Sequence, residues 1–168
     1  MPDLAHTLQG HDLGFLRAAA AAWGIELDAR DARAALAALP KLMLDARLAA
    51  EVVEALPEIG RQALSELSEQ EGRILWAAFT RKYGEVRAMG AAKRDRERPD
   101  LRPASPVELL WYRGLIGRAF MQTNGEPQEY AYIPDDLLEL LPAFASAAPP
   151  LPGRPATPGE IAHIWPAS

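Results

Sequence analysis

The chain lacks cysteine altogether, and this absence excludes disulfide bonds, thiolate nucleophiles and thiolate metal ligands. It also lacks any apolar run near the length of about 20 residues that a membrane-spanning helix requires. Its N-terminus, "MPDLAHTLQGHD", has neither the basic start nor the apolar core of a signal peptide. From these absences we expect a cytoplasmic protein with no membrane partner.

Motifs for catalysis and metal binding are missing too. There is no "GxxxxGK(S/T)" phosphate loop and no serine nucleophile elbow. His6 and His11 lie five residues apart, which is not the i, i+4 spacing of a helical ligand pair, and His163 is remote from both. The pair Asp135 and Asp136 follows a proline at a predicted helix start, where the helix dipole favours carboxylates. We therefore expect no enzymatic activity, no metal and no cofactor.

What the chain does contain is a hydrophobic fraction of 49%, much of it alanine, which favours helices because alanine loses no side-chain entropy in them. The net charge is −5, yet Lys and Arg outnumber Asp and Glu by two within residues 58–104. A domain that binds duplex DNA on its own usually presents a net basic face. The charge therefore weakens the case for such a protein and leaves room for a local contact.

Helical patterns fill residues 1–57, which we assign to an N-terminal helical subdomain. In "DLGFLRAAAAAWG", Asp12 is a predicted N-cap and Gly24 the stop. Asp28 is the predicted cap of the next helix, which Pro40 is expected to end. A third helix is predicted in "LDARLAAEVVEALP".

Residues 58–142 follow a different order. The helix "PEIGRQALSELSEQEG" precedes a short strand, "GRILW", and a helix, "WAAFTRKYG". After a basic loop, Ser105 is predicted to cap a helix, with Glu108 completing a capping box. A β-hairpin is predicted around Asn124–Gly125, before a last short helix capped by Asp135.

This order is that of a winged helix-turn-helix, in which the short strand pairs with the hairpin and the third helix enters the DNA groove in many members. We predict a mainly α fold with a small β-hairpin sheet, in which an N-terminal helical cap packs on a winged helix. A small α+β domain of another topology is the alternative. Residues 143–168 read as a Pro/Ala-rich linker or tail, which either leads into a longer protein or is a natural end.

The stretches "GRILWAAFTRKYGEVRAMG", "RDRERP", "SPVELLWYRGLIGRAF" and "QEYAYIPDDLLELLP" resemble an uncharacterised bacterial family. It is related to the helicase-associated winged-helix module beside XPB-type DNA helicases. The resemblance covers residues 58–142 and implies a winged-helix fold and a DNA-linked context. The segment "LGFLRAAAAAWGIELDARDARAALAALPKLM" resembles a SAP-type DNA-binding module, although the basic residues of such a module are mostly Ala or Asp here.

The helix at the recognition position is apolar on two sides. A groove-reading helix needs Arg, Lys, Asn or Gln toward the base edges, and this helix has few of them. We expect it to be buried twice, in its own core and under another element or a partner. The candidates for protein interaction are Leu109, Tyr112 and Ile116.

The basic loop is the remaining candidate for nucleic-acid contact. In an extended "KRDRER", Arg94, Arg96 and Arg98 would face away from Asp95 and Glu97 and offer a row of cations to phosphates. The same arginines could instead pair with neighbouring acids in a solvated loop. The full set of nucleic-acid-binding candidates is Arg81, Lys82, Arg87, Lys93, Arg94, Arg96 and Arg98.

Together these features predict a non-catalytic winged-helix adaptor module of a DNA-transaction, helicase-associated protein. Its basic loop would contact DNA weakly through phosphates, and its apolar helix would dock on further domains or a protein partner. The alternative is a pure protein-interaction scaffold that uses the helix 105–117 and has no nucleic-acid role.

Overall fold

The computed structural model describes residues 1–122 and 125–141. The elements are α1 (Leu4–Gln9), α2 (Leu13–Ala22), α3 (Ala32–Met43), α4 (Ala46–Glu54), α5 (Glu58–Glu69), β1 (Arg73–Leu75), α6 (Trp76–Tyr83), α7 (Ala91–Glu97), α8 (Pro106–Tyr112), β2 (Gly117–Gln122), β3 (Pro127–Tyr132) and α9 (Asp135–Leu138). The fold is mainly helical with a small three-stranded antiparallel sheet, which confirms the predicted fold class. The tail assigned to residues 143–168 lies outside the described residues.

Aspartate caps start most of the N-terminal helices. Asp12 caps α2, as predicted, by accepting a hydrogen bond from the Phe15 N–H. The prediction that Asp28 caps the next helix is wrong, because α3 starts three residues later behind Asp31. The guanidinium of Arg17 binds the Ala29 carbonyl at 3.1 Å and so holds the segment before Asp31 outside the helix.

The predicted end of α3 at Pro40 is also wrong, since the helix continues to Met43. A proline inside a helix costs about 3 kcal/mol because it removes one backbone donor and crowds the preceding turn. Leu39 and Met43 are fully buried on either side of it, and burial of side chains of this size contributes about 1.5–3 kcal/mol each. Tertiary packing of the last turn therefore outweighs the local preference.

The sheet has the order β1-β3-β2, so the short first strand pairs with the hairpin as the sequence predicts. Ala131 in the central strand lies opposite Ile74 on one side and Arg118 on the other. Asn124, in the predicted turn, lies outside the described residues. The prediction that Asp135 caps α9 is wrong, because Asp135 is the first residue of this helix. The carboxylate of Asp136 accepts hydrogen bonds from the backbone N–H groups of Leu137 and of Leu4, each at 2.9 Å.

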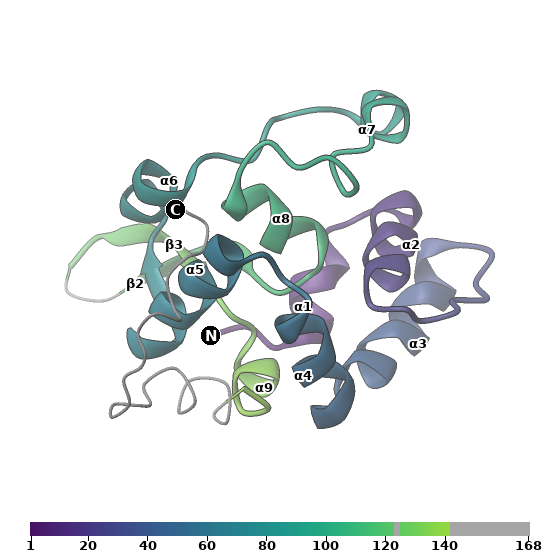
Figure 1. Cartoon of the computed structure of the whole chain (residues 1–168), viewed down its shortest axis with the longest axis horizontal. Coiled ribbons are helices and arrows are strands. Elements are labelled where there is room, and N and C mark those ends of the chain that lie inside the picture. The colour runs from purple at the N-terminus through teal and green to yellow at the C-terminus, as the bar shows by residue number, and fades with distance from the viewer. Residues whose placement is uncertain (123–124, 142–168) are drawn as a thin grey trace.

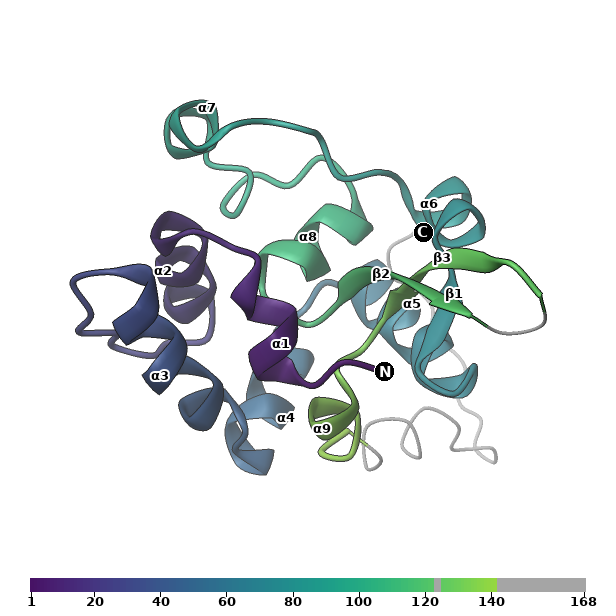
Figure 2. The ribbon, with the colours of Figure 1, turned by 180° about the vertical axis from the view of Figure 1, so that it is seen from behind.

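One hydrophobic core runs through both predicted units, residues 1–57 and 58–142. Figures 1 and 2 show α8 in the middle of the molecule, with α2 and α3 on one side and the sheet with α6 on the other. The indole N–H of Trp23, on the helical side, donates to the Arg113 carbonyl at the end of α8 over 2.7 Å. The N-terminal helices are thus part of the same packed body as the sheet.

Candidate interaction sites

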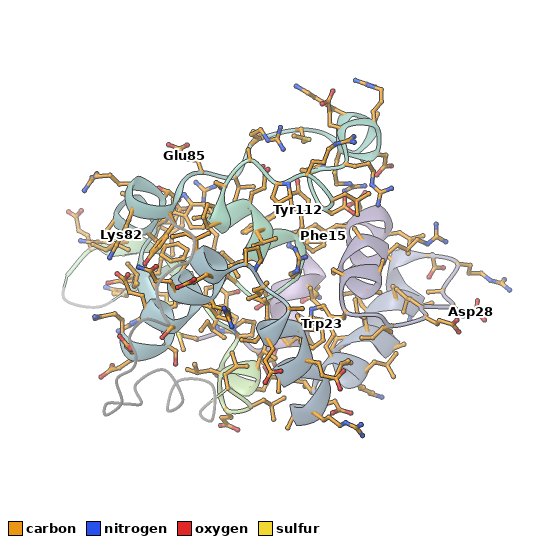
Figure 3. All side chains as sticks on the ribbon, viewed as in Figure 1. Phe15, Trp23, Asp28, Lys82, Glu85 and Tyr112 are labelled. Atoms are coloured by element: carbon orange, nitrogen blue, oxygen red, sulfur yellow. The ribbon has the colours of Figure 1, made fainter. Side chains whose placement is uncertain are left out.

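The three predicted protein-contact residues lie in the core. Leu109, Tyr112 and Ile116 are exposed by 7%, 5% and 2%. Leu109 packs so closely against Gly60 of α5 that a Cβ there would lie 2.8 Å from it. Figure 3 shows Tyr112 beside Phe15 of α2, and their ring centroids are 5.5 Å apart. α8 is therefore buried on both sides, as predicted, and the second covering comes from this chain.

Glu108 closes the base of the basic loop. Its fully buried carboxylate accepts hydrogen bonds from the backbone N–H groups of Arg87 at 2.9 Å and Ala104 at 2.7 Å, and it pairs with the Arg87 guanidinium. The predicted capping box is only half present, because Ser105 accepts from the Glu108 N–H while the carboxylate points to the loop. Burial alone would raise the pKa of Glu108, but the Arg87 guanidinium and the two backbone donors outweigh it and lower the pKa.

The tip of the loop is the helix α7, so the predicted extended row of arginines is wrong. Arg94 is the buried residue of α7, and its guanidinium binds the carboxylates of Asp12 and Asp95. A Cβ at Gly14 would lie 2.1 Å from this guanidinium, so the missing side chain makes room for it. The hydrogen bond from Arg94 lowers the pKa of Asp12, and the same bond raises the pKa of Arg94.

The other predicted cations divide into two groups. Lys82 pairs with Glu66 and Arg98 with Asp100, each at 2.8 Å. Four of the seven candidates are thus bound to acids of the same chain: Lys82, Arg87, Arg94 and Arg98. The other three, Arg81, Lys93 and Arg96, are exposed and have no carboxylate within 4.0 Å in the described part of the chain.

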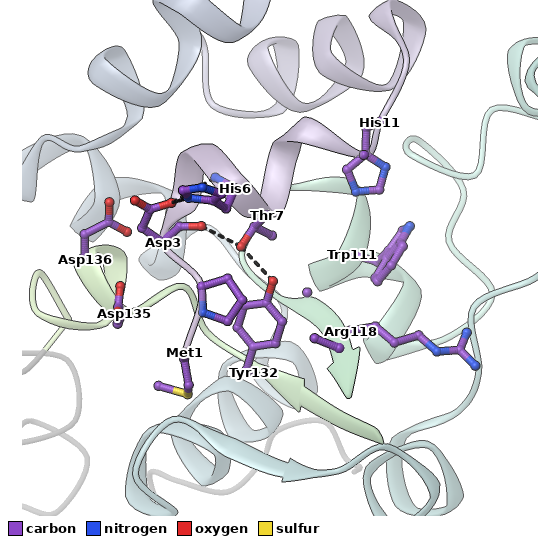
Figure 4. A pocket seen from close by; sticks show the side chains of 14 residues that line it. Met1, Asp3, His6, Thr7, His11, Trp111, Arg118, Tyr132, Asp135 and Asp136 are labelled. Atoms are coloured by element: carbon purple, nitrogen blue, oxygen red, sulfur yellow. Dashed lines mark hydrogen bonds and ion pairs between the residues drawn. The ribbon is translucent and has the colours of Figure 1, made fainter. Parts of the chain in front are cut away.

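A groove of about 1030 Å³ lies between α1, the edge of β2 and the start of α9 (Figure 4). Three carboxylates lie at one end of it, those of Asp3, Asp135 and Asp136, while Trp111 lies toward the other end. Sequence reasoning missed this groove because it explained Asp135 and Asp136 by a helix start and assigned no role to Asp3. The only local signal was that a three-stranded sheet must leave its outer strands with an open edge.

Close packing shapes the groove. The Thr7 hydroxyl donates to the Asp3 carbonyl at 2.7 Å and accepts from the Tyr132 hydroxyl at 2.8 Å. A Cβ at Gly117 would lie 2.5 Å from that phenol oxygen, so glycine is needed where β2 passes Tyr132. Burial raises the pKa of Tyr132, which keeps the phenol protonated and available as a donor. These contacts fix α1 beside the sheet.

His11 lines the same groove and is expected to make stability fall in mild acid. Its ring stacks on Phe15 at 3.7 Å and meets Trp111 edge-on, and burial lowers its pKa to about 4. The unfolded chain, with a histidine pKa of about 6.5, binds a proton first, so stability falls as pH drops below 6.5. We expect a loss of about 2 kcal/mol between pH 6.5 and 4.5, measured by urea unfolding. The variant His11→Phe should not show this loss of stability, whereas the control His6→Gln should show it unchanged. If the free energy of unfolding depends on pH in the same way in wild type and in His11→Phe, His11 is not the group responsible.

Comparison of the chain with protein-family models, with curated proteins and with solved structures finds no match. None of the helices in residues 1–122 and 125–141 has the length and apolar character that crossing a bilayer requires. The same residues hold no group of three or more His, Asp or Glu side chains placed to bind a metal ion.

Proposed function

We propose that the chain is a non-catalytic protein-interaction module, a winged helix with a helical cap that acts as an adaptor. The observation that carries the proposal is the burial of α8 between α2 and α5. A winged helix that reads DNA needs the helix at this position free to enter the major groove. Here the apolar side chains of α8 are used to hold the molecule together.

The charges support the same proposal. Arg87 and Arg94 join the basic loop to α8 and α2 through Glu108 and Asp12, so these cations act as a structural brace. The hairpin, which contacts phosphates in many winged helices, carries Glu126 and Glu129. In keeping with the resemblance to the helicase-associated module, such an adaptor would belong to a DNA-transaction protein.

A fluorescence-anisotropy titration with single- and double-stranded DNA at two salt concentrations tests this proposal. We expect no salt-dependent binding by the wild-type chain, because its net charge is −5 and four of the seven candidate cations pair with acids of the same chain. Binding that weakens steeply with salt would overturn the proposal.

The second candidate function is weak nucleic-acid contact, which the exposure of Lys93 and Arg96 on α7 favours. If DNA binds, the double variant Lys93→Ala/Arg96→Ala should reduce the slope of log K against log salt by about 2. The matched control removes two exposed cations from α3, Arg33 and Lys41, and should leave the slope unchanged. Equal slopes for both variants would exclude α7 as the contact.

A further inference from the structure

We propose that the groove between α1 and β2 receives an extended segment of a partner protein, which adds as a strand to the free edge of β2 and places basic side chains near Asp3, Asp135 and Asp136. This inference rests on the proposed function, since it names the surface and the kind of partner for a protein-interaction module. The groove takes the place of the helix 105–117 as the proposed docking surface, because that helix is already covered by α2 and α5.

The first support is the unpaired edge of β2. Within the described residues this strand pairs with β3 along its whole length, from Gly117 to Gln122, and with no other strand. The backbone N–H and C=O groups of its outer edge have the geometry to bind another strand. Gly117, Arg118 and Ala119 line the groove; Gly117 is buried against Thr7 and Tyr132, so the edge opens into the groove from Arg118 onward.

The second support is the shape of the groove. One wall is the helix α1, held in place by Thr7 and Tyr132, and the other is a strand edge. A space between a helix and an edge strand is where domains that bind by strand addition take extended peptides. A volume of about 1030 Å³ is large for a small-molecule pocket, and the part of β2 that lines the groove, residues 117–119, is about 10 Å long. The groove therefore fits a short stretch of extended chain.

The third support is charge complementarity. Asp3 uses one oxygen to accept from the His6 N–H and to bind the His6 ring at 2.7 Å, and Asp136 uses one to accept from the N–H groups of Leu4 and Leu137. The second oxygens of both, like the carboxylate of Asp135, have no hydrogen-bond partner among the described side chains and backbone. Arg118 does not neutralise them. Its guanidinium pairs with Glu129 at 2.7 Å, lies over the Trp76 ring at 4.5 Å and extends away from the acidic end in Figure 4. A Lys or Arg on the incoming strand would supply the missing charge.

The end of the groove opposite the three carboxylates favours an apolar side chain of the partner rather than a basic one. Trp111 is partly exposed there and meets the ring of His11 edge-on at 5.5 Å. Aromatic surface of this kind favours apolar contacts. An occupant with alternating basic and apolar residues matches the groove, because it has both kinds of side chain available at each end.

The test uses the full chain and fluorescein-labelled acetyl-Lys-Val-Lys-Val-Lys-Val-amide, with the Glu-Val repeat of the same length as the control. We expect the Lys-Val peptide to bind and the Glu-Val peptide to bind at least tenfold more weakly. The variant Asp135→Asn/Asp136→Asn should weaken Lys-Val binding about tenfold, while Asn keeps the acceptor for the Leu4 N–H. The control Glu54→Gln/Glu126→Gln removes two exposed charges away from the groove and should change binding less than twofold.

Strand addition makes a second, independent demand on the peptide backbone. A bound strand uses the N–H groups of one edge only, so N-methylation of alternate residues should abolish binding in one of two isomers and spare the other. The proposal is overturned if both N-methylated isomers bind as tightly as the unmethylated Lys-Val peptide. It is also overturned if the Lys-Val and Glu-Val peptides both fail to bind. A dimer in sedimentation velocity to which the Lys-Val peptide does not bind would assign the edge to a second copy and overturn it too. The DNA titration is a separate measurement, so failure of the peptide test leaves the proposed function standing.

Discussion

Replacing Glu108 with Ala should lower the free energy of unfolding by about 3 kcal/mol. The substitution leaves the backbone N–H groups of Arg87 and Ala104 without their acceptor, and it removes the buried anion that neutralises the Arg87 guanidinium. It also empties a fully buried site. Urea unfolding followed by circular dichroism at pH 7 measures the loss.

Two controls show whether the loss comes from the brace at the base of the loop. Glu108→Gln keeps an acceptor of nearly the same shape and should cost about half as much. Glu97→Ala removes an exposed carboxylate from α7 and should change stability by less than about 0.5 kcal/mol. If Glu108→Ala costs no more than Glu97→Ala, the loop is not held by this carboxylate.

The acid limb of the stability curve should change as well. Because the folded-state pKa of Glu108 lies below its ordinary value of 4.5, its contribution is present above pH 4.5 and is lost as pH falls through the lowered pKa. The Glu108→Ala variant lacks this contribution at every pH. The difference in stability between the two proteins should therefore become smaller in strong acid, and the part due to the emptied site should remain.

Replacing Trp23 with Ala should lower the free energy of unfolding by about 4 kcal/mol. Trp23 is 2% exposed, so the substitution leaves a cavity the size of an indole in the core shared by the N-terminal helices and α8. It also leaves the Arg113 carbonyl without the indole donor. Trp23→Phe keeps most of the volume and should cost about 2 kcal/mol, mainly through the lost hydrogen bond.

The shape of the transition matters as much as its midpoint. Because one core spans the chain, we expect helix content and tryptophan fluorescence to change in a single coincident transition, in wild type and in Trp23→Ala. Leu42→Ala, at a side chain that is 46% exposed on α3, should cost less than about 1 kcal/mol. Two separate transitions would show that residues 1–57 fold as their own unit and would contradict the shared core.

Local sequence rules predicted the elements where the relevant interaction spans only a few residues. Asp12 and Ser105 accept hydrogen bonds from N–H groups three residues ahead, so each cap is visible in the sequence. The same rules were wrong at Asp28 and Pro40. At these positions the outcome depends on Arg17, twelve residues from its carbonyl partner, and on packing of Met43 in the core.

The candidate sites follow the same division. The two apolar stripes of α8 predicted its burial on both sides, since hydrophobic periodicity records how many faces a helix hides. Arg94 binds Asp95 and Arg98 binds Asp100, as the alternative of pairing with neighbouring acids predicted. The other partners could not be predicted, because Arg87 meets an acid 21 residues away and Arg94 a second one that is 82 residues away. The groove could not be predicted either, because its lining residues come from three segments that are distant in the sequence: the start of the chain, the edge of β2 and the start of α9.

By itself, the sequence determined the fold class and the burial of α8, because caps, turns and periodicity act over neighbouring residues, and the order of its elements predicted that the first strand pairs with the hairpin. Only the tertiary structure decided that Glu108 and Asp12 bind the loop arginines, what covers α8, and which strand edge stays open. These outcomes depend on which distant segments the shared core brings together, and an ion pair or a groove wall forms only once they meet. The surface left for a partner is therefore a property of the packed molecule.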